Sequence, residues 1–235
     1  MASSRQASIS IIVPTLNERE TIVGALTPLQ RLRGKSIEIV VIDGRSADDT
    51  IELARPLADR VEISRRGRAA QMNTGALLAR GDVLLFLHAD TRLPPDFITL
   101  IQRALDGGRA WGRFNVRIDS RRLLLRIVAR MMNARSRLSG IATGDQAIFV
   151  RRGDCERIGG FPDIPLMEDI ALSKSLKRLS WPAVIPVPVL TSARRWERDG
   201  IVKTIILMWS LRWAYFWGAD PAGLAIRYEK APRRD

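Results

Sequence analysis

Residues 81–90 have the sequence GDVLLFLHAD, and this stretch decides the class of fold. Its five consecutive apolar residues, 83–87, are typical of a strand buried on both faces of a parallel sheet. Residues 8–13 and 37–42 form similar runs, and residues 61–64 form a shorter one. Between these runs, helices are expected at 18–32 after an Asn17 cap, up to 57 after a cap at Ser46 or Asp48, and at 68–79. This alternation predicts an α/β fold with a mostly parallel sheet covered on both faces.

The second half of the chain is less regular. Strands are expected at residues 111–118 and 146–150, and helices at 121–137 and 165–179. Residues 182–190 are interrupted by prolines, which predicts an edge strand because proline cannot donate to a sheet. Residues 201–217 are strongly apolar and are expected to be helical. No repeat or low-complexity linker divides the chain, so we treat both halves as one domain.

Carboxylates follow three of the expected strands. Glu18 comes after the first, Asp43 directly follows the second, and Asp90 follows the strand at 83–87. Each one alone is better explained as a cap or turn residue. The carboxyl ends of parallel strands meet at one edge, where α/β sheets bind ligands. Three carboxylates at that edge indicate hard oxygen ligands of the kind that Mg²⁺ or Mn²⁺ takes beside a phosphate.

The amino-acid composition excludes several classes of protein. The chain has 235 residues with Lys+Arg 38 and Asp+Glu 25, a net charge of +13, which calls for an anionic partner or surface. Its 46% hydrophobic content excludes a disordered chain. A single cysteine, Cys155, excludes a disulfide scaffold and a Cys-based zinc site. A single histidine, His88, excludes a multi-histidine metal cage. No secretory signal is evident, because the first apolar run is cut by Pro14.

Seven short motifs, in order, resemble the family 2 glycosyltransferases of the GT-A fold. Each motif is weak alone, and their order and spacing over residues 8–200 make the signal strong. Within the family, the chain is most similar to a small bacterial branch described as arsenosugar-biosynthesis-type or as carotenoid-glycosyltransferase-like. The motifs are VPTLNE (13–18), VIDGRSADDT (41–50), NTG (73–75), GDVLLFLHAD (81–90), GDQ (144–146), ED (168–169) and RRW (194–196).

The resemblance implies a fold and a reaction. The fold is a three-layer αβα sandwich, with a catalytic domain at residues 1–200 followed by an apolar helix and basic tail at 201–235. The reaction transfers a sugar from a nucleotide-diphosphate sugar, with a UDP-sugar as the expected donor, to an acceptor hydroxyl with inversion. Mn²⁺ or Mg²⁺ would stabilise the leaving diphosphate, and a base would take the acceptor's proton.

The resemblance also assigns donor-site residues. Asp43 matches the aspartate that contacts the nucleobase, and Glu18 matches a residue near the nucleoside. Asp90 matches the metal ligand that ends the Asp-x-Asp motif. His88 replaces the first Asp of that motif, and either contacts the ribose or diphosphate or ligates the metal through neutral imidazole. The structural alternative for His88 is a hydrogen bond to the backbone.

Further matches complete the expected site. Asp169 matches the catalytic base, and Glu168 before it helps to shape the site. Asp145 is expected to line the acceptor or sugar pocket. The remaining donor-binding candidates are Pro14, Thr15, Asn17, Arg68, Asn73 and the basic-aromatic motif Arg194, Arg195 and Trp196.

The helix at 201–217 has two interpretations. Three tryptophans spaced by four, Trp209, Trp213 and Trp217, share one face, which either packs on the domain or lies in a lipid interface. The fourteen residues 204–217 contain Arg212 and are shorter than a membrane span needs. Basic residues spaced by four on the helix at 121–137 would attract anionic lipid: Arg122, Arg126 and Arg130. The acceptor is therefore expected to be lipid-like or a small hydroxyl compound, in a cytoplasmic protein that the second interpretation places on the inner face of the cell membrane.

Two other functions compete. A nucleotidyltransferase would usually carry a glycine-rich basic loop after the first strand, and residues 14–18 contain no glycine. A non-catalytic basic module binding nucleic acid or membrane explains the charge of +13. It does not explain ordered carboxylates at strand ends, which repel phosphate without a metal. A glycosyltransferase that binds no nucleic acid is therefore the prediction.

Overall fold

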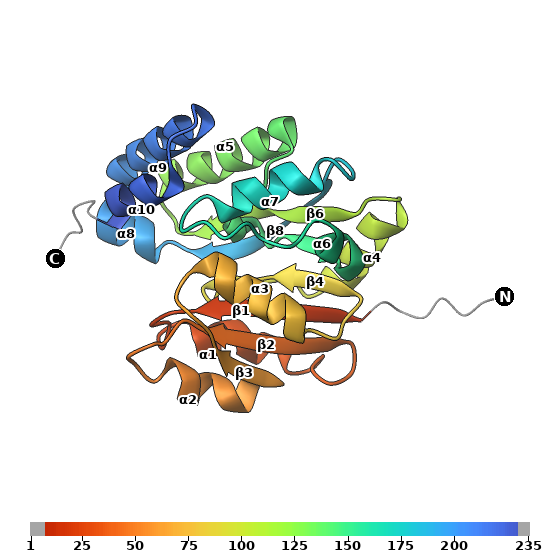
Figure 1. The fold of residues 1–235 in the computed structure, drawn as a ribbon. Coiled ribbons are helices and arrows are strands. Elements are labelled where there is room, and N and C mark those ends of the chain that lie inside the picture. Colours follow the sequence, from red (N-terminus) through yellow and green to blue (C-terminus); the bar gives the residue numbers. More distant parts are fainter. Residues whose placement is uncertain (1–7, 230–235) are drawn as a thin grey trace.

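The computed structural model describes residues 8–229. Its strands form one curled sheet, drawn at the centre of Figure 1, with the order β3-β2-β1-β4-β7-β6-β8-β5. The strands are β1 (Ile9–Thr15), β2 (Ile37–Asp43), β3 (Arg60–Ile63), β4 (Val83–Phe86), β5 (Thr91–Arg92), β6 (Trp111–Asp119), β7 (Phe149–Arg151) and β8 (Ala183–Ser192).

The first four strands form the parallel half of the sheet, as the sequence predicts. β1 pairs in parallel with β2 and with β4, and β2 pairs in parallel with β3. The register places Thr15 opposite Asp43, so the carboxyl ends of β1 and β2 meet at one edge. β7 is antiparallel to β4 and β6, while β6 and β8 are parallel.

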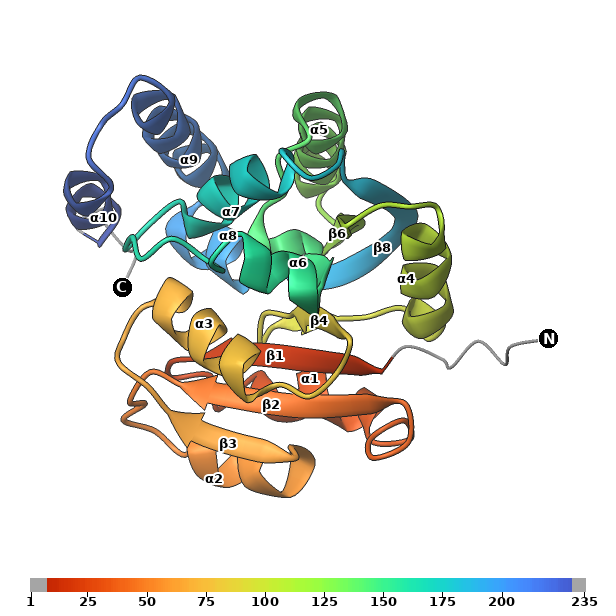
Figure 2. The same cartoon turned by 45° about the vertical axis from the view of Figure 1, so that its right-hand side comes forward.

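Helices cover both faces of the sheet and confirm the predicted three layers (Figure 2). Alternate residues of β1 divide between the two cores because strand side chains alternate. Ile11 belongs to the core under α1 (Ile22–Leu26), α2 (Thr50–Ala54) and α4 (Phe97–Asp106). Ile12 belongs to the opposite core, which contains residues of α3 (Arg68–Leu78), α6 (Arg152–Arg157) and α7 (Glu168–Leu176).

Four further helices gather around the β6–β8 half (Figure 2). They are α5 (Leu123–Ser139), α8 (Arg194–Asp199), α9 (Ile201–Phe216) and α10 (Pro221–Glu229). α9 packs against α5 through a cluster with Val128 and Ile205, and against α7 through a cluster with Ile170 and Leu211. The predicted division at residue 200 falls between α8 and α9 and stays a prediction. The basic tail after Glu229 lies outside the described residues.

The first helix is shorter than predicted. Asn17 adopts a positive φ of 55° and does not cap it, and its Oδ1 accepts instead from the Ala47 backbone N–H at 2.8 Å. α1 begins at Ile22 and passes at Thr27 into the 3-10 turn η1 (Thr27–Leu29), which carries a proline. The expected helix at 18–32 is therefore reduced to one short segment, because the chain around Asn17 is used to hold the neighbouring loop.

Two strand predictions are corrected. The predicted strand at 146–150 begins only at Phe149, because the segment before it is a 3-10 turn, η3 (Gly144–Gln146). β8 is not an edge strand, since β6 lies on one side and the two-residue β5 on the other. β5 reaches only Leu190 and Thr191, and the prolines sit where the β6–β8 register shifts. A local free edge and a bulge accommodate them.

Candidate functional site

A cavity of about 470 Å³ lies between the carboxyl edge of the sheet and helices α5, α7, α8 and α9. Residues from distant parts of the sequence line it. The sequence-predicted residues among them are Arg68, His88, Asp90, Asp145, Asp169, Arg195 and Trp196. The structure thus brings seven of the fifteen predicted site residues to one cavity.

His88 and Asp90 enter the cavity from the segment that follows β4. Burial, with the positive charge of Arg68, lowers the pKa of His88 to about 3, so its imidazole is neutral at pH 7. The ring lies against the backbone of Gly144, where an added Cβ would overlap Nε2. Burial and then the charge of Glu18 raise the pKa of Asp90. A cation bound beside Asp90 would stabilise the ionised carboxylate and so oppose both effects.

The donor set fits a divalent cation that is also held by substrate. Within the described residues no group of three or more His, Cys, Asp and Glu side chains is arranged to hold a metal. Asp90 offers an oxygen and neutral His88 a nitrogen. Mg²⁺ characteristically binds through one or two carboxylates plus substrate phosphates and water, and Mn²⁺ accepts the same ligands. The protein would therefore supply part of the coordination and a diphosphate the rest.

Asp169 is held at the start of α7 on the cavity wall. Its Oδ2 accepts from the Gly144 backbone N–H at 2.9 Å, and its Oδ1 accepts from the Ile170 backbone N–H at 2.7 Å. Burial raises its pKa despite these donors and the nearby charge of Arg212. Neighbouring Glu168 is buried, and burial together with Asp169 raises its pKa too. Asp169 is a fixed carboxylate with an elevated proton affinity, as a general base requires.

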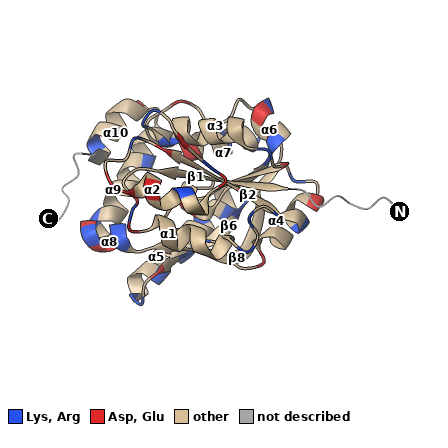
Figure 3. Ribbon diagram, turned by 90° about the horizontal axis from the view of Figure 1, so that it is seen from below, with Lys and Arg blue, Asp and Glu red and all other residues tan. Residues whose placement is uncertain are grey.

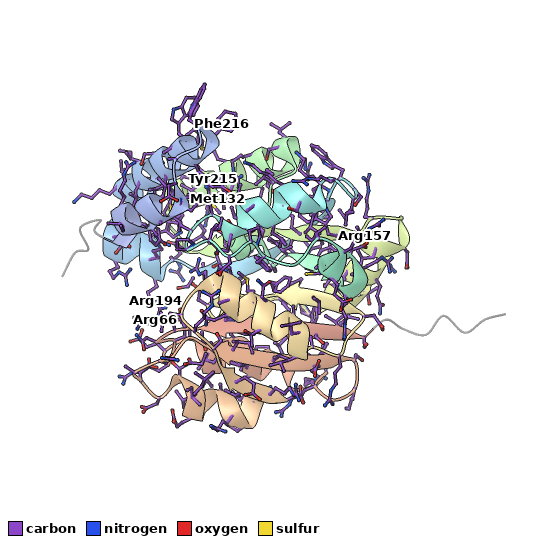
Figure 4. All side chains as sticks on the ribbon, viewed as in Figure 1. Arg66, Met132, Arg157, Arg194, Tyr215 and Phe216 are labelled. Carbon is purple, nitrogen blue, oxygen red and sulfur yellow. The ribbon has the colours of Figure 1, made fainter. Side chains whose placement is uncertain are left out.

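Arg194 joins α8 to the first strand's loop. Its Nη2 donates to Glu18 Oε2 at 2.8 Å, and its Nη1 donates to Glu20 Oε2 at 3.3 Å. Figure 4 labels Arg194 on the side of the first-strand loop. Arg194 and Asp90 also line a second cavity of about 390 Å³. Two residues predicted separately for the donor site, Glu18 and Arg194, are thus direct partners beside Asp90.

Five other predicted residues lie outside the main cavity. Asp43 is fully buried and accepts from Thr15 Oγ1 at 3.0 Å and from the Ser46 N–H and hydroxyl at 2.6 Å each. Asn73 holds the backbone of Phe161 through both an N–H and a carbonyl bond of 2.8 Å. Asn17 holds the loop at Ala47, and neither it nor Pro14 or Thr15 lines the cavity. Their roles in binding a nucleotide stay predictions.

The cavity also contains residues that the sequence analysis did not assign to the site. They come from α5 and α9, which face each other across it. A signal was present, because each helix has three apolar residues and an arginine at the spacing i, i+3, i+4, i+7. On α5 and α9 respectively these are Val128, Met131, Met132 and Arg135, and Ile205, Met208, Trp209 and Arg212.

The fold is that of the GT-A enzymes, as two solved structures show. A mannosyltransferase from Pyrobaculum calidifontis, solved with GDP-Man and Mn²⁺, superposes with a TM-score of 0.65 at 24% identity, covering 97% of this chain and 67% of that one. Glucosyl-3-phosphoglycerate synthase from Mycobacterium tuberculosis, solved with UDP and Mn²⁺, gives a TM-score of 0.58 at 21% identity over 79% of this chain and 70% of that one.

The sequence comparison names the family. The profile of Glycosyl transferase family 2 matches residues 10–154, and the chain belongs to that family. Dolichol-phosphate mannosyltransferase of Pyrococcus furiosus is 35% identical over 107 residues, 43% of this chain and 30% of that protein. Undecaprenyl-phosphate 4-deoxy-4-formamido-L-arabinose transferase of Pseudomonas paraeruginosa is 30% identical over 158 residues, 61% of this chain and 46% of that protein. The chain spans less than half the length of each.

Proposed function

We propose that this protein is an inverting glycosyltransferase that moves a sugar from a nucleotide-diphosphate sugar, a UDP-sugar by expectation, to an acceptor hydroxyl. One observation carries the proposal. One cavity is lined by Asp169 and by the pair His88 and Asp90. A base and a site for the leaving diphosphate are the two elements that this reaction needs. Family membership and the nucleotide-bound relatives support the same conclusion.

The residues divide the chemistry as follows. The acceptor oxygen forms a bond to the anomeric carbon while the bond from that carbon to the diphosphate oxygen breaks. Asp169 accepts the hydroxyl proton, held in place by the Gly144 N–H. Asp90 and His88 would hold Mn²⁺ or Mg²⁺, which would supply charge stabilisation for the leaving diphosphate. Arg68 and Arg195, which line the same cavity, add positive charge for the leaving group.

The test is release of nucleoside diphosphate from UDP-sugars and GDP-sugars, with Mn²⁺ or with EDTA. The proposal predicts release that requires the metal and an anomeric proton signal of inverted configuration in the product. Exposed Asp106 at the end of α4 provides a control, because Asp106→Asn lies outside the cavity and should change nothing. A product with retained anomeric configuration would contradict the proposal. Absence of turnover with every nucleotide sugar under these conditions would contradict it as well.

We further propose peripheral association with an anionic membrane surface. The three tryptophans of the apolar helix are not core residues, because Trp209, Trp213 and Trp217 are 60%, 67% and 70% exposed. Figure 4 shows neighbouring Phe216 projecting away from the body of the protein. Figure 3 shows Lys and Arg on nearby α8 and α5. No helix within residues 8–229 has the length and apolar character needed to cross a bilayer.

The membrane proposal is tested by replacing the three tryptophans together with serine. Because the side chains are exposed, the melting midpoint should stay within a few degrees, whereas buried tryptophans would cost roughly 3–5 kcal/mol each. Sedimentation with vesicles containing anionic lipid should fall. A wild-type protein that ignores such vesicles at low salt would refute the association.

A further inference from the structure

The groove between α5 and α9 is built in two chemically distinct parts. We call it the α5/α9 groove and define it by the eight residues of the repeated spacing. Three apolar residues on each helix form its outer part, and Arg135 and Arg212 form its inner end. At 1.5 Å rise per residue, the seven-residue span of each set makes the groove about 10 Å long. Its floor is the cluster in which Val128, Met132 and Ile205 pack together.

The outer part of the groove is open at its rim. Met131 is 51% exposed and Trp209 is 60% exposed, although both side chains line the cavity. Exposed apolar side chains continue beyond the rim on both helices. They are Leu123, Leu124 and Ile127 on α5, and Val202, Ile206 and Trp213 on α9. A hydrocarbon chain that lies in the groove and extends past its rim would therefore stay in contact with apolar side chains.

The inner end has unused hydrogen-bond donors. Arg135 Nε and Nη2 and Arg212 Nε are buried and donate to no atom of the described residues. Neither arginine belongs to an ion pair in that part of the chain. Burial, and then the charge of Arg212, lowers the pKa of Arg135 to about 10 even though Asp145 and Asp169 act in the opposite direction. Buried, unpartnered guanidinium groups are costly unless an anion completes them.

The two carboxylates at this end do not replace such an anion. Asp145 Oδ1 is itself buried without a hydrogen-bond partner, and Asp169 is held by two backbone N–H groups. Asp169 must also stay free to receive a proton. Paired guanidinium groups match the geometry of a phosphate or another oxyanion. The inner end is therefore complementary to an oxyanion carried into the cavity by a ligand.

We propose that the acceptor is an anionic amphiphile, whose oxyanionic head group is held by Arg135 and Arg212 and whose apolar chain lies in the α5/α9 groove. This rests on the proposed glycosyl transfer, since it places the acceptor beside Asp169. The two arginines at the inner end are complementary to an oxyanion, and the apolar side chains at the rim are complementary to a hydrocarbon chain. A ligand that carries both groups satisfies both ends of the groove. A neutral alcohol would leave the arginines unpaired, and a small phosphate would leave the groove empty.

The experiment titrates three probes by calorimetry: decyl phosphate below its micelle concentration, decanol and inorganic phosphate. Each titration is run with the full chain saturated with UDP and Mn²⁺, so that the donor site is occupied. Decyl phosphate should bind at least ten-fold more tightly than either other probe. Arg135→Gln and Arg212→Gln should each weaken decyl phosphate at least ten-fold and leave decanol unchanged. The controls are Arg137→Gln on α5 and Lys203→Gln on α9, both exposed residues outside the cavity.

Each of the other possible results would overturn a particular part of the proposal. Equal affinity for decanol and decyl phosphate would remove the oxyanion site, and equal affinity for inorganic phosphate would remove the groove. If the arginine variants lose UDP affinity instead, the arginines belong to the donor, and the proposal fails. UDP binding that needs Mn²⁺ without any binding of decyl phosphate would refute the amphiphile and leave the proposed transfer intact. Absence of UDP and GDP binding would refute the transfer itself.

Discussion

Replacing Asp169 by Asn tests whether this side chain acts as the catalytic base. The substitution keeps size and shape but removes the ability to take a proton. General-base loss typically lowers the rate by about 10²–10⁴, equivalent to roughly 2.7–5.4 kcal/mol at about 1.36 kcal/mol per tenfold. The loss should appear in turnover and not in donor affinity, because the interaction is made chiefly in the transition state.

The same substitution has a structural cost that can be measured separately. Gly144 and Ile170 donate to different oxygens of Asp169, and Asn retains only one of them. One backbone N–H then faces an amide NH₂, at a cost of about 1–3 kcal/mol in unfolding free energy. A domain of this size loses roughly 2–4 °C in Tm for each kcal/mol. Assays well below the variant's Tm therefore measure catalysis alone.

The pH dependence provides an independent check on Asp169. Burial raises its pKa, so it becomes protonated at a higher pH than an exposed aspartate does. Wild-type turnover should fall as the pH drops through this raised pKa, because the protonated form cannot act as a base. The remaining activity of Asp169→Asn should lack that acidic limb.

The assay is steady-state nucleoside diphosphate release, with nucleotide affinity measured in parallel. Near-normal turnover in Asp169→Asn would refute the assignment of the base, and Asp145 would be the next carboxylate to replace. Loss of donor affinity with the rate per bound donor unchanged would instead give Asp169 a binding role. The matched Asp106→Asn variant should be indistinguishable from wild type in both measurements.

Three further outcomes are expected. Asp90→Ala should abolish the Mn²⁺-dependent part of nucleotide affinity in a calorimetric titration and leave the circular dichroism spectrum unchanged; equal affinity would refute the metal assignment. Gly144→Ala should lower turnover by up to about 10², because its methyl group would overlap His88 Nε2 and displace the N–H that holds the base; Gly153→Ala, with no atom within 4 Å, is the silent control. Cys155, buried and with its pKa raised to about 11 by burial, should react with a thiol reagent at pH 8 only after unfolding, and fast reaction of the native protein would contradict its position.

The parallel half of the fold was predictable because its signals are local. Continuous apolar runs such as 83–87 have no polar face and must be buried on both sides of a sheet. The ends of these runs place His88 and Asp90 at the carboxyl edge of the sheet, and the resemblance to family 2 glycosyltransferases then suggested their roles. The predicted helix at 18–32 was too long because apolar spacing does not show that Asn17 adopts a positive φ to hold another loop.

The second half depends on contacts between residues far apart in sequence. The prolines of β8 suggested an edge, but a single short strand, β5, pairs with only its last part. The asparagine of the NTG motif, Asn73, is expected at the nucleotide, and that role stays a prediction; its bonds to the backbone of Phe161, 88 residues away, had no signal in the sequence. Arg135 and Arg212 were not selected because the sequence does not show that two helices so far apart along the chain face each other across one cavity.

The central claim is that this cavity binds a nucleotide diphosphate through a divalent cation. A thermal-shift panel of UDP, GDP, ADP and CDP, with their sugar conjugates, tests it most directly when each is added with Mn²⁺ and with EDTA. A ligand that binds the native state raises its midpoint. We expect a rise in the midpoint for at least one nucleotide, UDP by expectation, that requires Mn²⁺ and disappears in Asp90→Ala. No rise with any nucleotide, together with salt-sensitive binding to DNA, would contradict it.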